Sequence, residues 1–398
     1  MRIAIFSDNF YPELGGVSDS IITLAKELGS HGHRVRFYVP RYSRANYRKV
    51  GIAKPKEIQL GERVGITRFW SLPFRIGTGQ GRFVIPVGFR SIQIKMFDPD
   101  IIHSQLFFGT GLEALFSGKI LGKPVVGTNH TVIKEFLRYS PIKAKWFLDL
   151  VPRYVNWYYG KCDLTTAPAS SVIDDMRRVG FVGKTRIISN PIENEVFSPL
   201  LASERKKLAH VWKLAQPLIV YAGRLAPEKK VDILFHALAR TVKKIPRLRL
   251  AIAGHGRSEG DLRRLAKNLD ITEHVKFLGT ISKEKLNEIY NLANLFVTAS
   301  TSEVQPLTVM QAMASGIPSL AVKAGGLAEL ITEGVGSLVD PDDPEVFSKA
   351  LEALLKNSAK LKILGREALA QSSRFSPHAV ATEWEKTYRE IIETHRRK

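Results

Sequence analysis

Short apolar runs alternate with amphipathic helical stretches along the whole chain, and this alternation constrains the fold more than any other feature. Residues 2–8 (RIAIFSD) predict a strand, and residues 34–40 (RVRFYVP) predict another. Between them, residues 17–33 carry apolar side chains at helical spacing and predict a helix that stops near Gly29. Strands that alternate with helices are typical of a parallel, doubly wound α/β sheet.

A second series of the same kind starts near residue 217 and predicts a second α/β domain. A length of 398 residues suits about two domains. The joint is predicted within 189–200, where two prolines and a polar cluster interrupt the periodicity. We therefore predict an N-terminal Rossmann-like, acceptor-binding domain over 1–192 and a C-terminal Rossmann-like, nucleotide-sugar-binding domain over 193–376. Residues 377–398 predict a last helix that crosses back to the N-terminal domain.

The charge balance points to an anionic ligand or surface. Lys and Arg number 59 against 38 Asp and Glu, which gives a formal net charge of +21. Residues 1–190 carry +14 of this excess and residues 191–398 carry +7. Such an excess attracts nucleic acid, nucleotides or anionic lipid.

Composition also limits the cellular compartments in which the protein is expected. The one cysteine, Cys162, excludes a disulfide framework and a Cys-based zinc site, and a reducing cytoplasm fits best. No apolar run reaches the ~18–20 residues of a membrane span. The N-terminal residues turn acidic and Gly/Pro-rich too early for a signal peptide.

Two predicted sheets place two sets of strand carboxyl ends on either side of a cleft, where ligands of such sheets bind.

Gly15 and Gly16 follow the first strand and precede its helix. Two glycines allow a ligand close to the backbone, and the helix N-terminus offers free N–H groups. A tight turn without a ligand explains the same pair, and no GxxxxGK[ST] motif is present.

A second motif, residues 223–230 (GRLAPEKK), lies between a predicted strand and a predicted helix. Arg224 and Lys229 are five residues apart on this loop. A guanidinium and an ammonium that converge there would clamp a diphosphate. Two solvated cations are the alternative.

A third motif covers residues 302–318 and runs from a polar loop into an apolar helix. Glu303 stands at the end of a strand, where its carboxylate can accept hydrogen bonds from sugar hydroxyls. Leu307 and Thr308 would present backbone amides to an anion. Gln311 lies about one turn inside the helix, whereas the nearby methionines are expected in the core.

Other candidates are weaker. Two DxD sequences, at Asp98 and Asp340, are better explained by strand entry and turn chemistry. Gly254, in a Gly-His-Gly turn after a strand, is expected to line the donor cleft. His103 is either a cleft residue or a satisfied core residue, and the remaining histidines show no metal-ligand spacing.

Four segments together resemble the retaining nucleotide-sugar glycosyltransferases of family 4, which have the two-domain GT-B fold. They occur in the family's order over nearly the whole chain. The first segment and residues 127–139 (GTNHTVIKEFLRY) are most similar to enzymes that glycosylate diacylglycerol or other lipid-linked acceptors. The four segments are 6–21 (FSDNFYPELGGVSDSI), 127–131 (GTNHT), 221–234 (YAGRLAPEKKVDIL) and 303–318 (EVQPLTVMQAMASGIP).

The resemblance implies roles for individual residues. Gly15 and Gly16 match the glycine loop near the donor phosphates. His130 matches the histidine that contacts the transferred sugar. Arg224 and Lys229 match the pair that neutralises the diphosphate leaving group. Gly223 and Gly254 are expected to contact the donor as well.

In the last segment the chain departs from the family pattern. Glu303 matches the first Glu of an E-x7-E pair, which binds the donor sugar. The second position is Gln311, which lacks the charge of the family's ribose-binding Glu, so weaker or differently oriented ribose binding is implied. Pro306 replaces a residue that is usually Gly, which leaves Leu307 and Thr308 to supply the phosphate-facing amides.

The resemblance implies a hexosyltransferase that keeps the anomeric configuration. The cations and helix-end amides would stabilise charge on the departing diphosphate, so no metal and no other cofactor is expected. No enzymic nucleophile is evident, which suggests front-face attack with the phosphate oxygen accepting the acceptor's proton. Domain closure would exclude water.

The acceptor side is expected in the N-terminal domain. Residues 134–161 hold six Lys/Arg against two acidic residues, together with many aromatic residues. Cations and rings together suit an anionic membrane interface. We therefore expect a lipid acceptor and peripheral contact with the inner face of the cell membrane. A core helix with a solvated basic face is the alternative. The aromatic residues are Phe136, Tyr139, Trp146, Phe147, Tyr154, Trp157, Tyr158 and Tyr159.

Two other functions stay open at this point. One is a transferase for a soluble sugar or polysaccharide acceptor. The other is a non-catalytic binder of a phosphate polymer or nucleic acid on the same scaffold. No helix-turn-helix, zinc-finger or RNP-type motif is present, so a nucleic-acid partner is not expected.

Overall fold

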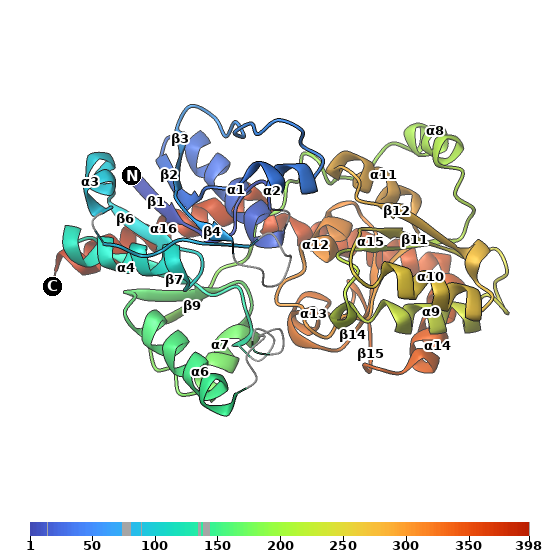
Figure 1. Cartoon of the computed structure of the whole chain (residues 1–398). Helices are drawn as coiled ribbons and strands as arrows, with labels where there is room; N and C mark the ends of the chain where they lie inside the picture. Colours follow the sequence, from blue (N-terminus) through green and yellow to red (C-terminus); the bar gives the residue numbers. More distant parts are fainter. Residues whose placement is uncertain (14, 74–80, 89, 134–136, 138–143, 398) are drawn as a thin grey trace. The chain divides into compact units, whose positions relative to one another are not determined.

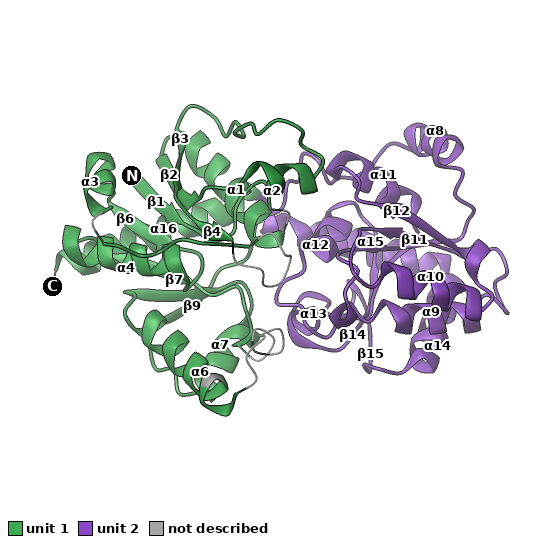
Figure 2. Cartoon of the chain, in the orientation of Figure 1, with its two compact units in different colours: residues 1–191, 377–398 green, residues 192–376 purple. Residues whose placement is uncertain are grey.

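The computed structural model describes residues 1–13, 15–73, 81–88, 90–133, 137 and 144–397. The chain divides into two units, and each has its own parallel sheet (Figure 2). Unit 1 contains residues 1–191 and 377–398, and unit 2 contains residues 192–376. The doubly wound α/β fold predicted from the sequence is therefore confirmed in both halves.

The sheet of unit 1 has seven parallel strands in the order β3-β2-β1-β6-β7-β8-β9. The chain winds outward from β1 to β3 and then returns to place β6 beside β1. This reversal creates a topological switch point between β1 and β6, where ligands of such sheets bind. The strands are β1 (Arg2–Phe6), β2 (Arg34–Pro40), β3 (Val64–Phe69), β6 (Ile101–Ser104), β7 (Val125–Thr128), β8 (Leu164–Ala167) and β9 (Thr185–Ile187).

Both faces of the central strand β1 are covered, which explains why its residues 3–6 are all apolar and buried. Ile3 and Ile5 of β1 pack with α1 and α16 on one face, whereas Ala4 and Phe6 pack with α3 and α4 on the other. A short antiparallel pair, β4 (Leu72–Pro73) and β5 (Arg82–Phe83), lies outside the sheet. The helices are α1 (Gly16–Ser30), α2 (Arg44–Lys49), α3 (Ser91–Phe97), α4 (Gly109–Leu121), α6 (Lys145–Gly160), α7 (Ser170–Arg178) and α16 (Pro377–Arg396).

The last helix, α16, belongs to unit 1 although unit 2 precedes it in the chain (Figure 1). It packs beside α1 and buries Trp384 and Tyr388 in the core that contains Leu24 and Leu28. The apolar stripe predicted for residues 17–33 is thus the face that α1 turns toward the sheet and α16.

The sheet of unit 2 has six parallel strands in the order β12-β11-β10-β13-β14-β15. Its switch point lies between β10 and β13, whose registers pair Ile219 with Leu295 and Val220 with Phe296. The strands are β10 (Leu218–Ala222), β11 (Arg249–Ala253), β12 (Val275–Gly279), β13 (Leu295–Thr298), β14 (Ser319–Val322) and β15 (Gly336–Val339).

Helices cover this second sheet, and Leu250, Phe235 and Met310 contribute fully buried side chains to its core. Several helices begin at caps readable in the sequence: Asp343 accepts N–H bonds from the first turn of α14, and Pro344 opens that helix. The helices are α8 (Ala202–Trp212), η1 (Pro227–Lys229), α9 (Val231–Thr241), α10 (Glu259–Asn268), η2 (Thr272–His274), α11 (Lys283–Leu292), α12 (Leu307–Ala314), α13 (Gly325–Leu330), α14 (Pro344–Leu355), α15 (Ser358–Ser372) and η3 (Ser373–Phe375).

Among the described residues, none of the helices combines the length and the apolarity needed to cross a bilayer.

Candidate active site

The predicted site residues of unit 2 lie at its topological switch point. Arg224 and Lys229 follow β10, and Glu303 follows the neighbouring strand β13. Lys229 Nζ donates to Glu303 Oε1 over 2.6 Å, and the two side chains are only 17% and 18% exposed. The structure therefore joins the second and third sequence motifs directly, through a partly buried ion pair.

Arg224 has a carboxylate partner of its own that the sequence analysis did not single out. Its guanidinium donates to Glu228 Oε1 over 2.8 Å, and Glu228 is almost fully buried while the Arg224 side chain is 44% exposed. Arg257 lies 4.0 Å from the other oxygen of Glu228. The two cations of the predicted clamp are thus each oriented by a carboxylate, and Arg224 keeps a solvent-facing surface. The signal was available: Glu228 stands four residues after Arg224 in the same motif.

Gly223 and Gly254 let two loops run side by side beyond the strand ends. Gly223 N–H donates to Ala253 O over 2.9 Å, and both glycines have positive φ, 151° and 145°. A Cβ on Gly254 would lie 1.9 Å from Gly223 O, which no side chain allows. Backbone packing alone therefore requires a glycine at 254.

A second pair of glycines, missed by the sequence analysis, holds the loop that carries Glu303. Gly326 N–H donates to Glu303 O over 2.9 Å, and a Cβ on Gly326 would lie 1.4 Å from Val304 O. A Cβ on Gly325 would lie 2.6 Å from Glu303 O, and Gly325 has a φ of 47°. Two adjacent glycines directly after a predicted strand were the available signal.

Helix α12 begins where the third motif predicts. The N–H groups of Leu307 and Thr308 belong to its first turn, where an α-helix has no carbonyl of its own to accept them. Gln311 lies one turn further and is 8% exposed, whereas Met310 and Met313 are fully buried in the core, as expected.

In unit 1 the glycine loop after β1 leads into α1. Gly15 is the N-cap residue, with an extended φ of 176°, and α1 starts at Gly16. A Cβ on Gly15 would meet no described atom within 4 Å. The packing of the described residues therefore does not itself demand a glycine at 15.

His130 follows β7 and is part of a polar chain. Its Nε2 lies 2.8 Å from Gln105 Oε1, and the Gln105 amide nitrogen lies 3.0 Å from His103 Nε2. His103 Nδ1 lies 2.7 Å from the hydroxyl of Tyr388 on α16. His103 is fully buried, so of the two expectations for it the satisfied core residue is correct.

Burial sets the protonation state of the two histidines in this row of polar side chains. It lowers the pKa of His130 to about 4 and that of His103 to about 3, because a charged ring loses its hydration there. Both rings are therefore neutral near pH 7. A carbonyl oxygen only accepts, so the proton of His130 sits on Nε2 and its Nδ1 keeps a free lone pair for a hydroxyl donor.

Comparisons with known proteins define the class. The model for Glycosyltransferase Family 4 matches residues 14–196, and the model for glycosyl transferases group 1 matches residues 203–371. HepE of Anabaena, solved in complex with UDP-glucose, superposes with a TM-score of 0.75 over 98% of this chain and 100% of its own, at 19% identity. The fold is therefore the GT-B fold of glycosyltransferases.

Two relatives refine this assignment. The chain is 29% identical over 364 residues to an alpha-monoglucosyldiacylglycerol synthase of Streptococcus pneumoniae, which covers 89% of this chain and 78% of the relative. It is 25% identical over 410 residues to the enzyme of the same name from Acholeplasma laidlawii, over 100% and 99% of the two chains. The protein belongs to the family 4 glycosyltransferases and has glycolipid synthases among its relatives.

Proposed function

We propose that this glycosyltransferase moves a sugar, with retention of configuration, from a nucleoside-diphosphate sugar to a hydroxyl of a membrane glycolipid precursor such as diacylglycerol. Two relatives are named alpha-monoglucosyldiacylglycerol synthases, and a third, 28% identical over 302 residues, is named a sulfoquinovosyl transferase of Arabidopsis thaliana. These names favour a lipid acceptor over the soluble-sugar alternative.

One observation in unit 1 supports the lipid acceptor most directly: α6 has an exposed aromatic and basic face. Trp146 is 66% exposed, Leu150 51% and Trp157 48%, and Arg153 is exposed between them. Their spacing of four, three and four residues places them in one row along the helix. Large apolar side chains in such a row are costly in water and suit a partner that is itself apolar.

The opposite face of α6 is a core face. Val155, Tyr158 and Tyr159 are buried, and Tyr159 donates to Thr128 O over 3.0 Å. A buried face opposite a solvated face is what the alternative of a core helix predicts, but the exposed face of α6 carries large apolar side chains as well as Arg153. The basic and aromatic residues predicted over 134–136 and 138–143 lie outside the described residues.

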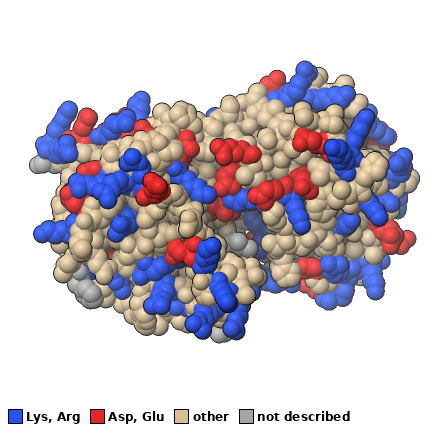
Figure 3. Space-filling model, turned by 90° about the horizontal axis from the view of Figure 1, so that it is seen from above, with Lys and Arg blue, Asp and Glu red and all other residues tan. Residues whose placement is uncertain are grey.

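A peripheral membrane contact fits this face. Rings settle at the boundary between headgroups and acyl chains, and each cation near an anionic leaflet adds about 1 kcal/mol. On the face seen in Figure 3, Lys and Arg side chains are interspersed with Asp and Glu. We propose that α6 docks on the inner leaflet of the cell membrane and that no nucleic acid is bound.

In unit 2, we propose that Arg224 and Lys229 bind the diphosphate and stabilise the charge that develops as it leaves. Glu303, held by Lys229, would accept hydrogen bonds from the donor sugar. The first-turn amides of α12 would bind a phosphate, and Gln311 would contact the ribose. This assignment leaves no step that requires a metal ion.

In unit 1, we propose that the neutral ring of His130 accepts a hydrogen bond from a sugar hydroxyl at Nδ1, with Gln105 fixing its tautomer. Gly15 and Gly16 would approach the donor phosphates through their backbone. The acceptor's proton would pass to the departing phosphate oxygen, in a front-face reaction that needs no enzymic nucleophile.

The test screens radiolabelled nucleotide sugars against anionic vesicles that contain diacylglycerol and against soluble sugars. A variant with Trp146→Ala, Leu150→Ala and Trp157→Ala should lose vesicle binding and lipid glycosylation but keep hydrolysis of the donor. The matched control changes exposed residues of α8 in unit 2: Lys206→Ala, Lys207→Ala and Val211→Ala. Transfer to soluble sugars alone, with no vesicle binding at low salt, would overturn the lipid acceptor in favour of a soluble one.

A further inference from the structure

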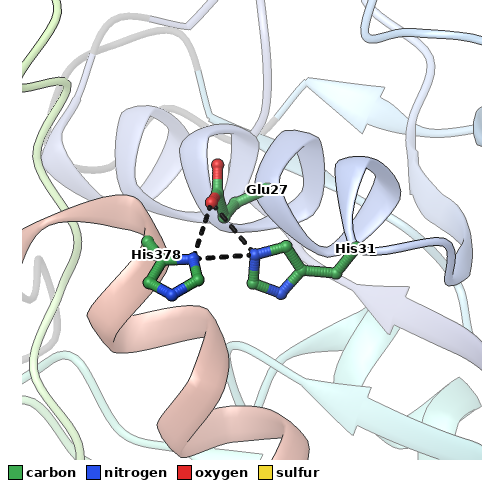
Figure 4. A group of neighbouring side chains, drawn as sticks. All are labelled: Glu27, His31 and His378. Carbon is green, nitrogen blue, oxygen red and sulfur yellow. Dashed lines mark hydrogen bonds and ion pairs between the residues drawn. The ribbon is translucent and has the colours of Figure 1, made fainter.

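The end of α1 and the start of α16 bring together three side chains that the reaction does not use (Figure 4). Glu27 lies in the last turn of α1, His31 is the C-cap residue that follows this helix, and His378 comes from the first turn of α16. His31 Nε2 lies 3.2 Å from Glu27 Oε1 and 3.1 Å from His378 Nδ1, and the third side of the triangle measures 3.6 Å. Although His31 and His378 are 347 positions apart in the chain, the three side chains thus place three possible metal-ligand atoms close together.

The hydrogen bonds around His31 show which atoms carry lone pairs. His31 Nδ1 lies 2.7 Å from Glu385 Oε1, and a carboxylate oxygen only accepts, so the ring's proton sits on Nδ1 in that contact. In a neutral ring, Nε2 then carries a lone pair. This lone pair faces a carboxylate oxygen of Glu27 and a nitrogen of His378. Lone pairs at these distances repel one another unless a proton or a cation lies between them.

We propose that Glu27, His31 and His378 bind a divalent zinc ion that joins α16 to α1. Zinc takes His nitrogen and carboxylate oxygen at about 2.0–2.2 Å in tetrahedral geometry, which separates the ligand atoms by about 3.3–3.5 Å. The three measured separations bracket this value. Two imidazoles favour zinc over the oxygen-seeking magnesium and calcium ions.

Exposure and second-sphere contacts also fit a metal site. His378 is 76% exposed at its side chain, so an ion can enter from solvent, and water can complete the tetrahedron. Glu385 holds His31 in the carboxylate–histidine arrangement that orients metal-binding imidazoles and raises their basicity. Glu385 is fixed in turn by Arg389, at 3.1 Å.

The expected role is structural. The ion would tie the first turn of α16 to the end of α1. Helix α16 also carries Tyr388, which bonds to His103 in the row of polar side chains that leads to His130. Zinc would therefore stabilise unit 1, including the polar side chains that hold His130 in place. It would not act on the reacting sugar.

The experiment titrates ZnCl2 into the metal-stripped, tag-free protein by calorimetry and records melting curves with and without zinc. The wild type should bind a single zinc ion and melt at a higher temperature when zinc is present. A ligand that binds the folded state but not the unfolded state stabilises the folded state. His378→Ala and Glu27→Gln should abolish both effects. Glu385→Gln should weaken binding by about 10- to 100-fold, the usual effect of removing a second-sphere partner.

His395→Ala is the matched control: it removes a histidine at the other end of α16, where it pairs with Asp163, and should bind zinc like the wild type. Because His378 is so exposed, His378→Ala should fold normally, which far-ultraviolet circular dichroism checks. A wild type that binds no zinc, or a His378→Ala variant that binds it with wild-type affinity, would overturn the proposal.

Discussion

Lys229 Nζ lies 2.6 Å from Glu303 Oε1, so one ion pair connects the loops that follow the two neighbouring strands at the switch point of unit 2. In the proposed reaction each partner binds a different part of the donor, Lys229 the diphosphate and Glu303 the sugar. The ion pair would hold the two side chains in place before the donor binds. The entropy that is lost when these side chains are ordered for the transfer reaction is then smaller.

The first prediction concerns this cationic site. Lys229→Ala or Arg224→Ala should lower kcat more than about 10²-fold, the scale of removing one charge-stabilising group. Lys230→Ala is the matched control, because Lys230 is the next residue but pairs with Asp342. Steady-state transfer assays measure the effect, and near wild-type rates in both folded variants would contradict the assignment.

The second prediction concerns Glu228. Glu228→Gln keeps the size of the side chain but removes the charge that holds Arg224 at 2.8 Å. We expect weaker binding of the free nucleoside diphosphate, by calorimetry, because Arg224 must then be ordered by the ligand. In a double-mutant cycle, Glu228→Gln should barely change nucleotide affinity once Arg224→Ala is present. Additive effects of the two substitutions on affinity would contradict coupling of the two residues.

The third prediction concerns Gln311. Gln311→Glu should lower the melting temperature of the free protein, because position 311 is only 8% exposed and an unpaired carboxylate there is poorly solvated. The same variant should bind free nucleotide more tightly, since ribose hydroxyls would satisfy the carboxylate. An unchanged nucleotide affinity, measured by calorimetry, would show that position 311 does not face the ribose.

The fourth prediction concerns the protonation of His130. With a pKa of about 4, this ring should stay neutral from pH 8 down to pH 6 and should contribute no break to the pH–rate profile in that range. Nuclear magnetic resonance of labelled histidine, assigned with a His130→Gln variant, reports this directly. A titration midpoint near 6.5 would show that the ring is hydrated like a free imidazole.

The fifth prediction concerns Asp8, at the end of β1. Burial raises the pKa of Asp8 to about 6, although its Oδ1 accepts the Thr110 N–H at 2.9 Å. A raised carboxyl pKa means that the folded state binds the proton more tightly, so its contribution to stability is present below pH 4 and is lost as pH rises through 6.

Asp8→Asn should therefore stabilise the protein at pH 8 relative to the wild type, by up to about 3 kcal/mol at 1.36 kcal/mol per pKa unit. The difference in the free energy of unfolding should shrink as pH falls toward 4. Urea unfolding at several pH values measures it, and a difference that does not depend on pH would exclude a titrating Asp8.

Local patterns in the sequence determined the fold class and the places of the main site residues. A helical period of 3.6 or a short apolar run depends on neighbours within a few positions, so residues 17–33 identify a helix and residues 34–40 a strand. The positions of Arg224, Lys229 and Glu303 just after predicted strands placed each of them at a carboxyl edge of a sheet, where ligands bind, and the family resemblance implied their roles on one donor.

Only the tertiary structure decided which of these residues meet. That Lys229 pairs with Glu303 depends on β13 lying beside β10, and that Gly326 supports Glu303 depends on α13 following β14 at the same edge. The histidines show this most clearly. Sequence spacing indicated no metal ligands among them, yet the packing of α16 on α1 places His378 beside Glu27 and His31. Such contacts arise because burial of apolar faces fixes the register between distant elements, and no local period of the chain encodes that register.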